Sequence, residues 1–385
     1  MNHHQKHPMS VPLVDLGAQH EEIAGELEAG LKEVFAQTSF IGGPAVAQFE
    51  QAYAAFLGAR NCVGVANGTE ALELALRASG VREGGEVILP ANTFIATAEA
   101  VSRIGAVPVP VDVDPDYLLI DPERVEAAVT ARTQAIMPVH LFGQTAFVER
   151  LEPIAAACGA LIIEDAAQSQ GASRLGRFAG TLGAAAGTSF YPGKNLGAAG
   201  DAGAVVTDDD GIATRVRLLG SHGSAVKYQH DAIGMNSRLD ALQAVVLNAK
   251  LRRLASWNER RRQAAKRYSD LLQDAPGVVP PRSAEGNTDV WHLFVIRIAE
   301  RDRVLAALNE AGIGAGVHYP VPVHLSGAYR NLDLAPGSFP VAEKAAQTML
   351  SLPMYPHISA EQQEYVVDVL RREVAAGRSA DRVRS

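Results

Sequence analysis

Short apolar segments recur through the first half of the chain and alternate with longer stretches of mixed polarity. Most of them are almost continuously apolar, which is typical of strands buried on both faces of a mostly parallel sheet. Because helical patterns lie between several of these segments, the sequence predicts an α/β sandwich. The predicted strands are 62–65, 86–89, 107–113, 135–141, 160–164, 188–190 and 204–207.

The segment 69–79 shows the helical pattern clearly. Leu72 and Leu76 lie one helical turn apart, and we expect their face to pack on the sheet. Glu70 and Glu73 fall on the other side of the helix. We expect these two carboxylates to point to solvent.

A much longer helix is predicted at 239–275, where the chain contains neither Gly nor Pro. Ser237 and Asp240 have the spacing of a capping box, and a Pro-Gly pair at 276–277 supplies a stop. The second half of the segment is strongly charged. We therefore expect one helix to connect two domains.

Two domains are also expected from length, because the chain has 385 residues and a single core seldom grows beyond ~300. We place an N-terminal segment and a large domain at 1–257, and a smaller domain at 258–385. The smaller domain is predicted to contain strands 290–298 and 316–319, helices 301–311 and 360–375, and a frayed basic tail at 377–385.

Composition narrows the class of protein. Hydrophobic residues make up 47% of the chain and charged residues 20%, as in an ordinary globular protein. The net charge of −8 argues against nucleic acid as a partner. No apolar run is long enough to predict a membrane span. Residues 1–10 lack the apolar region of a secretion signal, and the contexts of Cys62 and Cys158 predict buried, reduced thiols, so a cytoplasmic protein is expected.

Lys194 has distinctive surroundings in the tract TSFYPGKNLG at 188–197. Small and apolar neighbours predict a desolvated amine with a lowered pKa, which can form a Schiff base with a carbonyl compound. An exposed lysine on a glycine-flanked turn is the alternative that the tract alone leaves open.

A second candidate site lies where the first predicted strand meets its helix, in VGVANGTEAL at 63–72. Free N–H groups at a helix start, with the Thr69 hydroxyl, form a natural anion site. An ordinary turn capped by Thr69 is the alternative. No Gly-x-Gly-x-x-Gly fingerprint follows a strand, and no Walker lysine motif is present, so a dinucleotide or triphosphate is not favoured.

The strand at 160–164 ends in two adjacent carboxylates, Glu164 and Asp165. Successive residues of a strand point to opposite faces, so only one of them is expected at the ligand-binding edge of the sheet. Such a carboxylate could bind a metal or a cationic heterocycle. Histidine or cysteine ligands at suitable spacing are absent, so we expect no metal.

Two further features complete the set. Phe94 follows the strand at 86–89 and could either stack on an aromatic ring or join the core. The tract GMNSRLD at 234–240 places polar groups at the start of the long helix, which is another position suited to an anion. An anion cradle, a strand-end carboxylate, an aromatic ring and a desolvated lysine together predict pyridoxal phosphate.

Five tracts carry a resemblance to a known family: VPLVDL at 11–16, NGTEAL at 67–72, EDAAQ at 164–168, SFYPGKN at 189–195 and NSRLD at 236–240. The chain resembles the DegT-type nucleotide-sugar aminotransferases over nearly its whole length. The resemblance implies the aspartate-aminotransferase fold, which is fold type I of the pyridoxal-phosphate enzymes. Sugar dehydratases of this family replace the lysine with histidine, so Lys194 favours transamination.

The resemblance also implies roles around the cofactor ring. Lys194 would hold the cofactor covalently as the catalytic residue. Asp165 would contact the pyridine nitrogen, Gln168 would lie near the ring oxygen, and Phe94 would lie on the ring face.

A second group of residues would bind the cofactor phosphate. The resemblance assigns Gly68, Thr69 and Ser189 to this task within one subunit. Asn236 would reach the phosphate from the neighbouring subunit, which implies an obligate homodimer with shared active sites.

Substrate residues are expected in the C-terminal part. The tracts VWHLF at 290–294 and VHYPVPVHL at 317–325 look like those of enzymes that aminate carbon 3 of dTDP-linked 3-keto-6-deoxyhexoses for antibiotics or surface glycans. His318 and Tyr319 would touch the sugar or its diphosphate, or else order the domain contact. L-Glutamate, which becomes 2-oxoglutarate, is the expected amino donor, and glutamine is the alternative.

Three other functions stay open at this point. A carbon-4 sugar aminotransferase shares the cofactor motifs. So does an aminocyclitol aminotransferase that acts on a keto-inositol. A pyridoxal-phosphate-binding regulator without turnover is the third, and the acidic charge and the lack of an appended DNA-binding domain disfavour it.

Overall fold

The computed structural model describes residues 9–384, so most of the N-terminal tract at 1–10 lies outside the described residues. Its centre is a seven-stranded sheet in the order β1-β9-β8-β5-β4-β2-β3, in which β9 alone runs antiparallel to its neighbours. Every predicted strand of the large domain overlaps one of these seven. They are β1 Asn61–Val65, β2 Glu86–Pro90, β3 Val107–Val111, β4 Thr133–Ile136, β5 Leu161–Asp165, β8 Ala185–Ser189 and β9 Gly203–Thr207.

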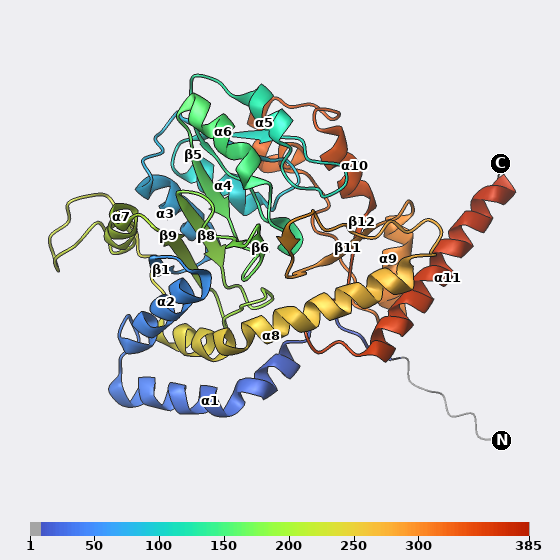
Figure 1. The fold of residues 1–385 in the computed structure, drawn as a ribbon, viewed down its shortest axis with the longest axis horizontal. Coiled ribbons are helices and arrows are strands. Elements are labelled where there is room, and N and C mark those ends of the chain that lie inside the picture. The colour runs from blue at the N-terminus through green and yellow to red at the C-terminus, as the bar shows by residue number, and fades with distance from the viewer. Residues whose placement is uncertain (1–8, 385) are drawn as a thin grey trace.

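Helices cover both faces of the sheet, which confirms the predicted α/β sandwich. One face carries α3, α4 and α7, and the other carries α2, α5, α6 and the first half of α8. Figure 1 shows α8 running from this sheet toward the C-terminal helix. The bounds are α1 Leu16–Gln37, α2 Pro44–Leu57, α3 Gly68–Ala78, α4 Ile95–Arg103, α5 Pro122–Ala128, α6 Val148–Cys158, α7 Asp210–Gly220 and α8 Ala241–Leu272.

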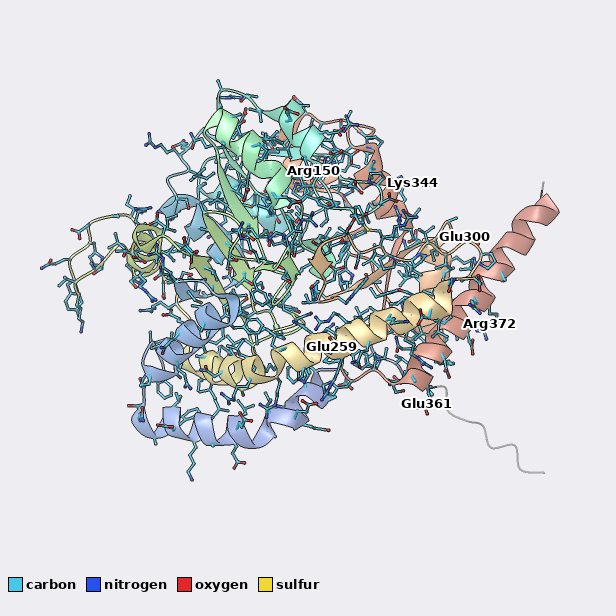
Figure 2. The ribbon with its side chains drawn as sticks, in the orientation of Figure 1. Arg150, Glu259, Glu300, Lys344, Glu361 and Arg372 are labelled. Carbon is cyan, nitrogen blue, oxygen red and sulfur yellow. The ribbon has the colours of Figure 1, made fainter. Side chains whose placement is uncertain are left out.

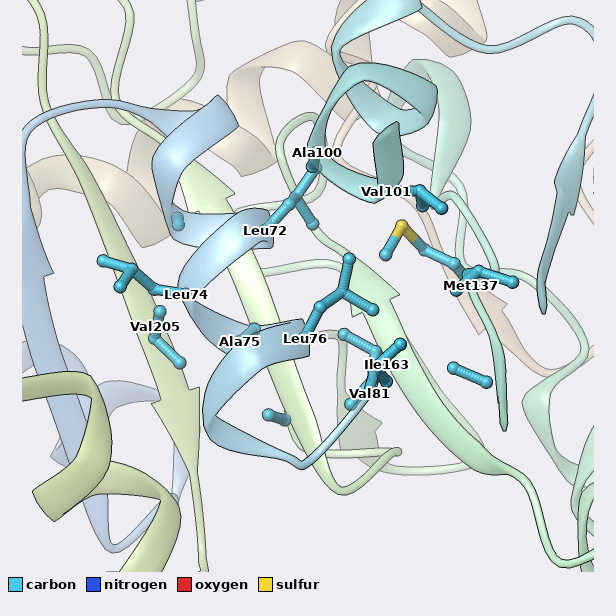
Figure 3. Packing of buried hydrophobic residues seen from close by; sticks show 14 of the residues in the cluster. Leu72, Leu74, Ala75, Leu76, Val81, Ala100, Val101, Met137, Ile163 and Val205 are labelled. Atoms are coloured by element: carbon cyan, nitrogen blue, oxygen red, sulfur yellow. The ribbon is translucent and has the colours of Figure 1, made fainter. Parts of the chain in front are cut away.

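Strand residues alternate between two separate cores. Val87 and Leu89 of β2 pack with α3 and α4, whereas Ile88 joins the core on the opposite face. Figure 3 shows the first of these cores, with Leu72 and Leu76 of α3 among the residues that fill it. The strands are apolar almost throughout because their side chains are buried on both faces of the sheet.

One prediction for α3 is wrong. Glu73 does not point to solvent but is 4% exposed. Its carboxylate is 2.6 Å from Arg103 Nε on α4 and 3.4 Å from Arg77 Nη1. Because α4 packs against α3, the expected solvent side of α3 is covered, and two arginines balance the buried charge.

The long helix is real, but its cap differs from the prediction. Asp240 occupies the N-cap of α8 without a side-chain hydrogen bond. Ser237 instead accepts a hydrogen bond from the backbone N–H of Ala66, 3.2 Å away. The predicted capping box is therefore wrong, because Ser237 ties the segment before α8 to the end of β1.

The C-terminal part contains a two-stranded sheet of β11 and β12. The predicted strand at 316–319 is wrong, since this Gly- and Pro-flanked segment forms a loop with a single bridge at Gly316. The partner of β11 is β12, which the sequence analysis missed. The predicted frayed tail is also wrong, because α11 continues to Arg384. The elements are β11 Phe294–Arg297, α9 Arg301–Glu310, α10 Pro340–Thr348, β12 Met349–Leu352 and α11 Ala360–Arg384.

Short elements connect these layers. The strands β6, β7 and β10 form a small antiparallel sheet. The bounds are β6 Ser173–Arg174, β7 Arg177–Phe178, β10 Asn287–Thr288, and the 3₁₀ helices η1 Leu141–Gly143, η2 Val323–Leu325 and η3 Gly327–Leu332.

We propose that the smaller domain begins within α8, near residue 258. The first half of α8 packs on the large sheet, whereas Tyr268 and Leu272 join a second core with α9 and α11. Glu259 marks the middle of α8 in Figure 2, and Arg372 lies on the neighbouring α11. Val11 also belongs to the second core, so the N-terminal segment crosses to the smaller domain.

Two predictions from composition meet the structure here. Cys62 is buried and free, but Cys158, at the end of α6, is partly exposed, so its predicted burial is wrong. Among the described residues, no helix combines the length and apolar character needed to cross a membrane.

Leu76→Ala should lower the free energy of unfolding by about 2–5 kcal/mol, because Leu76 is fully buried and the deletion leaves a cavity. Denaturant unfolding measures the change. Leu175→Ala removes the same atoms from a side chain that is 65% exposed. It should change the free energy by less than about 0.5 kcal/mol. Equal effects of the two substitutions would contradict the assignment of Leu76 to the core.

Candidate active site

A cavity of about 700 Å³ lies at the carboxyl ends of the central strands, where open α/β sheets bind ligands. It brings together nine of the ten residues that the sequence analysis singled out. These are Gly68, Thr69, Phe94, Asp165, Gln168, Ser189, Lys194, His318 and Tyr319. Asn236 does not line it.

Lys194 lies on the loop that follows β8. A tight turn, in which its backbone N–H donates to the Tyr191 carbonyl at 2.8 Å, projects the side chain into the cavity. Burial lowers the pKa of Lys194 to about 8, and the negative charge of Asp165 acts against this shift. The ammonium group has no hydrogen-bond partner in the described part of the chain. Lys194 is therefore an amine that loses its proton readily and is free to react.

Asp165 is the last residue of β5 and faces the cavity. It accepts hydrogen bonds from the Thr97 hydroxyl at 2.7 Å and from the Ala167 N–H at 3.1 Å. Burial raises the pKa of Asp165, while Thr97, Ala167 and the nearby Lys194 act against the shift. A protonated heterocycle beside this carboxylate would supply a positive charge that favours its ionised form and offsets the effect of burial on its pKa.

Glu164 points to the opposite side of the sheet, as strand alternation predicts. It accepts hydrogen bonds from the backbone N–H groups of Gly180, Leu182 and Gly183, and its Oε2 lies 2.7 Å from His140 Nε2. His140 Nδ1 in turn accepts from the Ala146 N–H at 3.0 Å. These bonds use both carboxylate oxygens, so Glu164 and His140 hold loops together and take no part in the cavity.

The start of α3 forms an anion cradle. Asn67, not Thr69, caps this helix, and it accepts a hydrogen bond from the Glu70 N–H at 2.9 Å. The N–H groups of Gly68 and Thr69 belong to the first turn, which has no preceding carbonyls to bond. A Cβ at Gly68 would lie 2.5 Å from Ser189 Cβ, so glycine lets the two segments close around the site.

The opposite wall of the cavity is aromatic. The rings of Phe94 and Tyr319 lie 5.1 Å apart, and Phe94 is half exposed. Gln168 donates from Nε2 to the Tyr319 hydroxyl at 2.9 Å and accepts from the Phe142 N–H at 2.6 Å. Gln168 therefore links the strand end to the loop that carries Tyr319.

Among the cavity residues that were not singled out from the sequence are Thr97, Tyr191 and His292. Thr97 donates a hydrogen bond to Asp165. It lies in the first turn of α4, just after Phe94 in the sequence, and this proximity to a predicted site residue could have indicated it. Tyr191 lies within the lysine tract. His292 lies in the tract VWHLF, but no residue type near it in the sequence indicates a contact with the lysine loop.

The cavity fits pyridoxal phosphate. The cradle at Gly68 and Ser189 suits the phosphate, and the Asp165 carboxylate suits a pyridine nitrogen. Phe94 offers a ring face, and Lys194 has an unpaired amine.

Comparisons with known proteins agree with this geometry. The model of the DegT/DnrJ/EryC1/StrS aminotransferase family matches residues 21–371. The erythromycin biosynthesis sensory transduction protein EryC1 of Saccharopolyspora erythraea is 47% identical over 94% of this chain and 99% of its own. The dTDP-3-amino-3,4,6-trideoxy-alpha-D-glucose transaminase of Streptomyces venezuelae is 45% identical over 94% of this chain and 95% of its own.

A solved structure shows the same fold. The crystal structure of S. venezuelae DesV in complex with a ketimine intermediate superposes with a TM-score of 0.92 at 45% identity. The superposition covers 94% of this chain and 98% of that chain. The crystal structure of NtdA from Bacillus subtilis, 33% identical with a TM-score of 0.88 over 96% of this chain and 86% of that chain, contains the pyridoxamine form of the cofactor. The chain belongs to the DegT/DnrJ/EryC1/StrS aminotransferase family, a family of enzymes that depend on pyridoxal phosphate.

Proposed function

We propose that this protein transfers an amino group from L-glutamate to carbon 3 of a dTDP-linked 3-keto-6-deoxyhexose, in deoxysugar or antibiotic biosynthesis. The observation that carries the proposal is the unpaired Lys194 amine in one cavity with the buried Asp165 carboxylate. The transaminase of S. venezuelae, whose name specifies a 3-amino sugar, supports the choice of substrate and carbon.

The residues divide the chemistry among them. When bound, pyridoxal phosphate supplies a carbonyl that takes up the amino group and a ring that stabilises negative charge on the neighbouring carbon. Lys194, with a pKa of about 8, would carry the proton, taking it up as a neutral amine and releasing it as an ammonium ion. Asp165 would keep a proton on the ring nitrogen. Gly68, Thr69 and Ser189 would bind the phosphate.

His318 and Tyr319 are proposed to contact the sugar. Both line the cavity on the side of the smaller domain. His318 Nδ1 lies 2.8 Å from the Ser351 hydroxyl of β12, and Gln168 orients the Tyr319 hydroxyl. These contacts fix two polar groups beside the amine, as recognition of a hydroxylated ligand requires.

The proposed assembly is a homodimer with shared active sites. Asn236 is exposed and lies outside the cavity of its own subunit. The segment before it carries exposed apolar side chains, including Tyr228 at 83% and Ile233 at 89% exposure. A second subunit would cover these side chains and receive Asn236 at its phosphate cradle. We also infer a cytoplasmic location from the two unpaired cysteines.

A regulator without turnover is the second candidate. The name of the EryC1 relative, which describes sensory transduction, favours it. The free Lys194 amine and a cavity large enough for cofactor and sugar favour an enzyme.

Purified protein with pyridoxal phosphate should convert a dTDP-linked 3-keto-6-deoxyhexose to its amino sugar when L-glutamate is supplied, with product identified by mass spectrometry. Matched reactions contain 4-keto sugars, keto-inositols or glutamine. If keto-inositol were converted and none of the keto sugars were, the protein would be an aminocyclitol aminotransferase and the proposed sugar acceptor would be wrong. A bound cofactor that no amino acid converts to its amine form would favour the regulator.

Borohydride reduction in the presence of pyridoxal phosphate should attach the cofactor to Lys194, and the initial rate of attachment should rise with pH until it levels off above about 8. Only the neutral amine reacts, and burial lowers the pKa of Lys194 from 10.5 to about 8. Below that pH the neutral fraction falls about tenfold per unit. Peptide mapping gives the position of the adduct.

Lys250 is the matched comparison for this experiment. Burial also lowers the pKa of Lys250 to about 8, but it lies on α8 outside the cavity. Lys250 should stay unlabelled, and Lys194→Ala should lose both the adduct and turnover. If both lysines were labelled, the lowered pKa would be sufficient for the reaction, and the position of Lys194 in the cavity would not explain its labelling.

Mixing inactive Lys194→Ala and Asn236→Ala subunits should restore part of the activity. Each mixed dimer then contains one site with an intact lysine and an intact Asn236 from its partner. Activity is measured after joint unfolding and refolding of the two variants, and each variant refolded alone is the control. No recovery in refolded mixed dimers would argue that Asn236 serves its own subunit.

A further inference from the structure

His292 is a polar cavity residue that the proposed chemistry does not use. It lies in the connection between β10 and β11 and lines the same cavity as Lys194. Its side chain is almost fully buried, at 9% exposure. A histidine in this position must either donate or accept hydrogen bonds at each ring nitrogen.

The hydrogen bonds of Asn195 determine which ring nitrogen carries the proton. Asn195 donates from Nδ2 to the Val290 carbonyl at 2.8 Å and to Asn258 Oδ1 at 3.0 Å. Because a backbone carbonyl only accepts, Val290 fixes the orientation of the Asn195 amide. Asn195 Oδ1 is then the acceptor that lies 3.3 Å from His292 Nδ1, so Nδ1 carries the hydrogen.

Asn258 of α8 is fixed in the same way. It donates from Nδ2 to the Gln170 carbonyl at 2.9 Å, which leaves its Oδ1 toward Asn195. Gln170 in turn donates to the Ser189 carbonyl at 2.8 Å. A chain of hydrogen bonds therefore runs from Ser189 at the phosphate cradle through Gln170, Asn258 and Asn195 to His292, with the link between Asn258 and Gln170 made by the backbone carbonyl of Gln170. The amide orientations of Asn195 and Asn258 are both fixed by backbone carbonyls.

The surroundings of His292 keep its ring neutral. Burial lowers the pKa of His292, and the positive charges of Lys194 and Arg261 and the nearby His318 act in the same direction. Arg261 is fully buried and donates to the Trp291 carbonyl at 3.1 Å. The carboxylates of Glu70, Asp165 and Asp201 line the cavity, and Asp165 is already hydrogen bonded to Thr97.

A neutral ring with its hydrogen on Nδ1 has a lone pair on Nε2. In the described part of the chain, no residue donates to this atom. We propose that His292 determines substrate specificity: its Nε2 accepts a hydrogen bond from a hydroxyl group of the sugar ring bound beside Lys194. This inference rests on the proposed function and names a contact by which the site recognises its acceptor.

The chemistry of Nε2 selects between the two substrates that share the cavity. A sugar hydroxyl can donate to a lone pair, whereas the carboxylates of glutamate only accept at neutral pH and its amino group is taken up by the cofactor carbonyl. His292 therefore offers a hydrogen bond to the sugar and none to the amino donor. Its loss should raise the KM for the sugar and leave the half-reaction with glutamate unchanged.

The proton position is tested first, on wild-type protein without cofactor. Nitrogen NMR of ¹⁵N-histidine-labelled protein, with the His292 signal assigned from its loss in His292→Phe or His292→Gln, should show hydrogen on Nδ1 and none on Nε2 at pH 7. Hydrogen on Nε2, or on both nitrogens, would overturn the inference. This measurement does not depend on any enzymatic activity.

The kinetic test compares His292→Phe with wild type. We expect the KM for the keto sugar to rise about tenfold, the value of one good hydrogen bond, with the glutamate half-reaction unchanged. His20→Phe makes the same substitution at an exposed position on α1 and should leave both unchanged. His292→Gln retains an acceptor and should recover most of the sugar KM.

Sugar analogues that each lack one hydroxyl separate recognition from a purely structural role. One analogue should raise the KM of wild type and erase the difference between wild type and His292→Phe. An equal penalty with every analogue, or a loss shared with the glutamate half-reaction, would overturn the inference. If wild type turns over no keto sugar, the proposed function fails, whereas turnover with an unchanged KM in His292→Phe refutes this contact alone.

Discussion

The pairing of β5 with β8 is the constraint on which the site depends. The two strands lie side by side and in parallel, with Asp165 opposite Gly187. A carboxylate at the end of one strand thus lies beside the loop that carries Lys194. The same burial that raises the pKa of Asp165 lowers that of Lys194, so the charged form of each group is less favoured than in water.

The hydrogen-bond chain from Gln170 to His292 connects the lysine loop to α8 and to the segment before β11. Its members are buried and their orientations are fixed by carbonyl groups, so the cradle and the lysine loop cannot shift independently. Asn258 is the link because it lies on α8, which belongs to both cores. The cavity is consequently lined by residues that precede α8 and residues that follow it, and this continuous helix connects the two cores.

The sequence predicted the strands of the large sheet and nine of the residues that line the cavity, because both follow from local patterns. Buried parallel strands are apolar throughout, and Lys194 and Asp165 stand out against small or apolar neighbours. Glu73 and Ser237 were misjudged because tertiary partners, α4 and the end of β1, decide their surroundings. His292 could not be found for the same reason, since its partner Asn195 lies far away in the sequence. The proposed role of the exposed Asn236 depends on a second subunit. The pairing of β11 with β12 joins segments that lie far apart in the sequence.

The continuity of α8 has a consequence for how ligands reach the cavity. A helix of 32 residues without Gly or Pro is a stiff rod, about 48 Å long at 1.5 Å per residue. Wide hinge motion between the domains would require that rod to bend, at the expense of its backbone hydrogen bonds. We therefore expect the entrance of the cavity to keep a nearly constant width. Substrates would then be distinguished by the shape and polarity of the cavity walls more than by closure of the protein around the correct substrate.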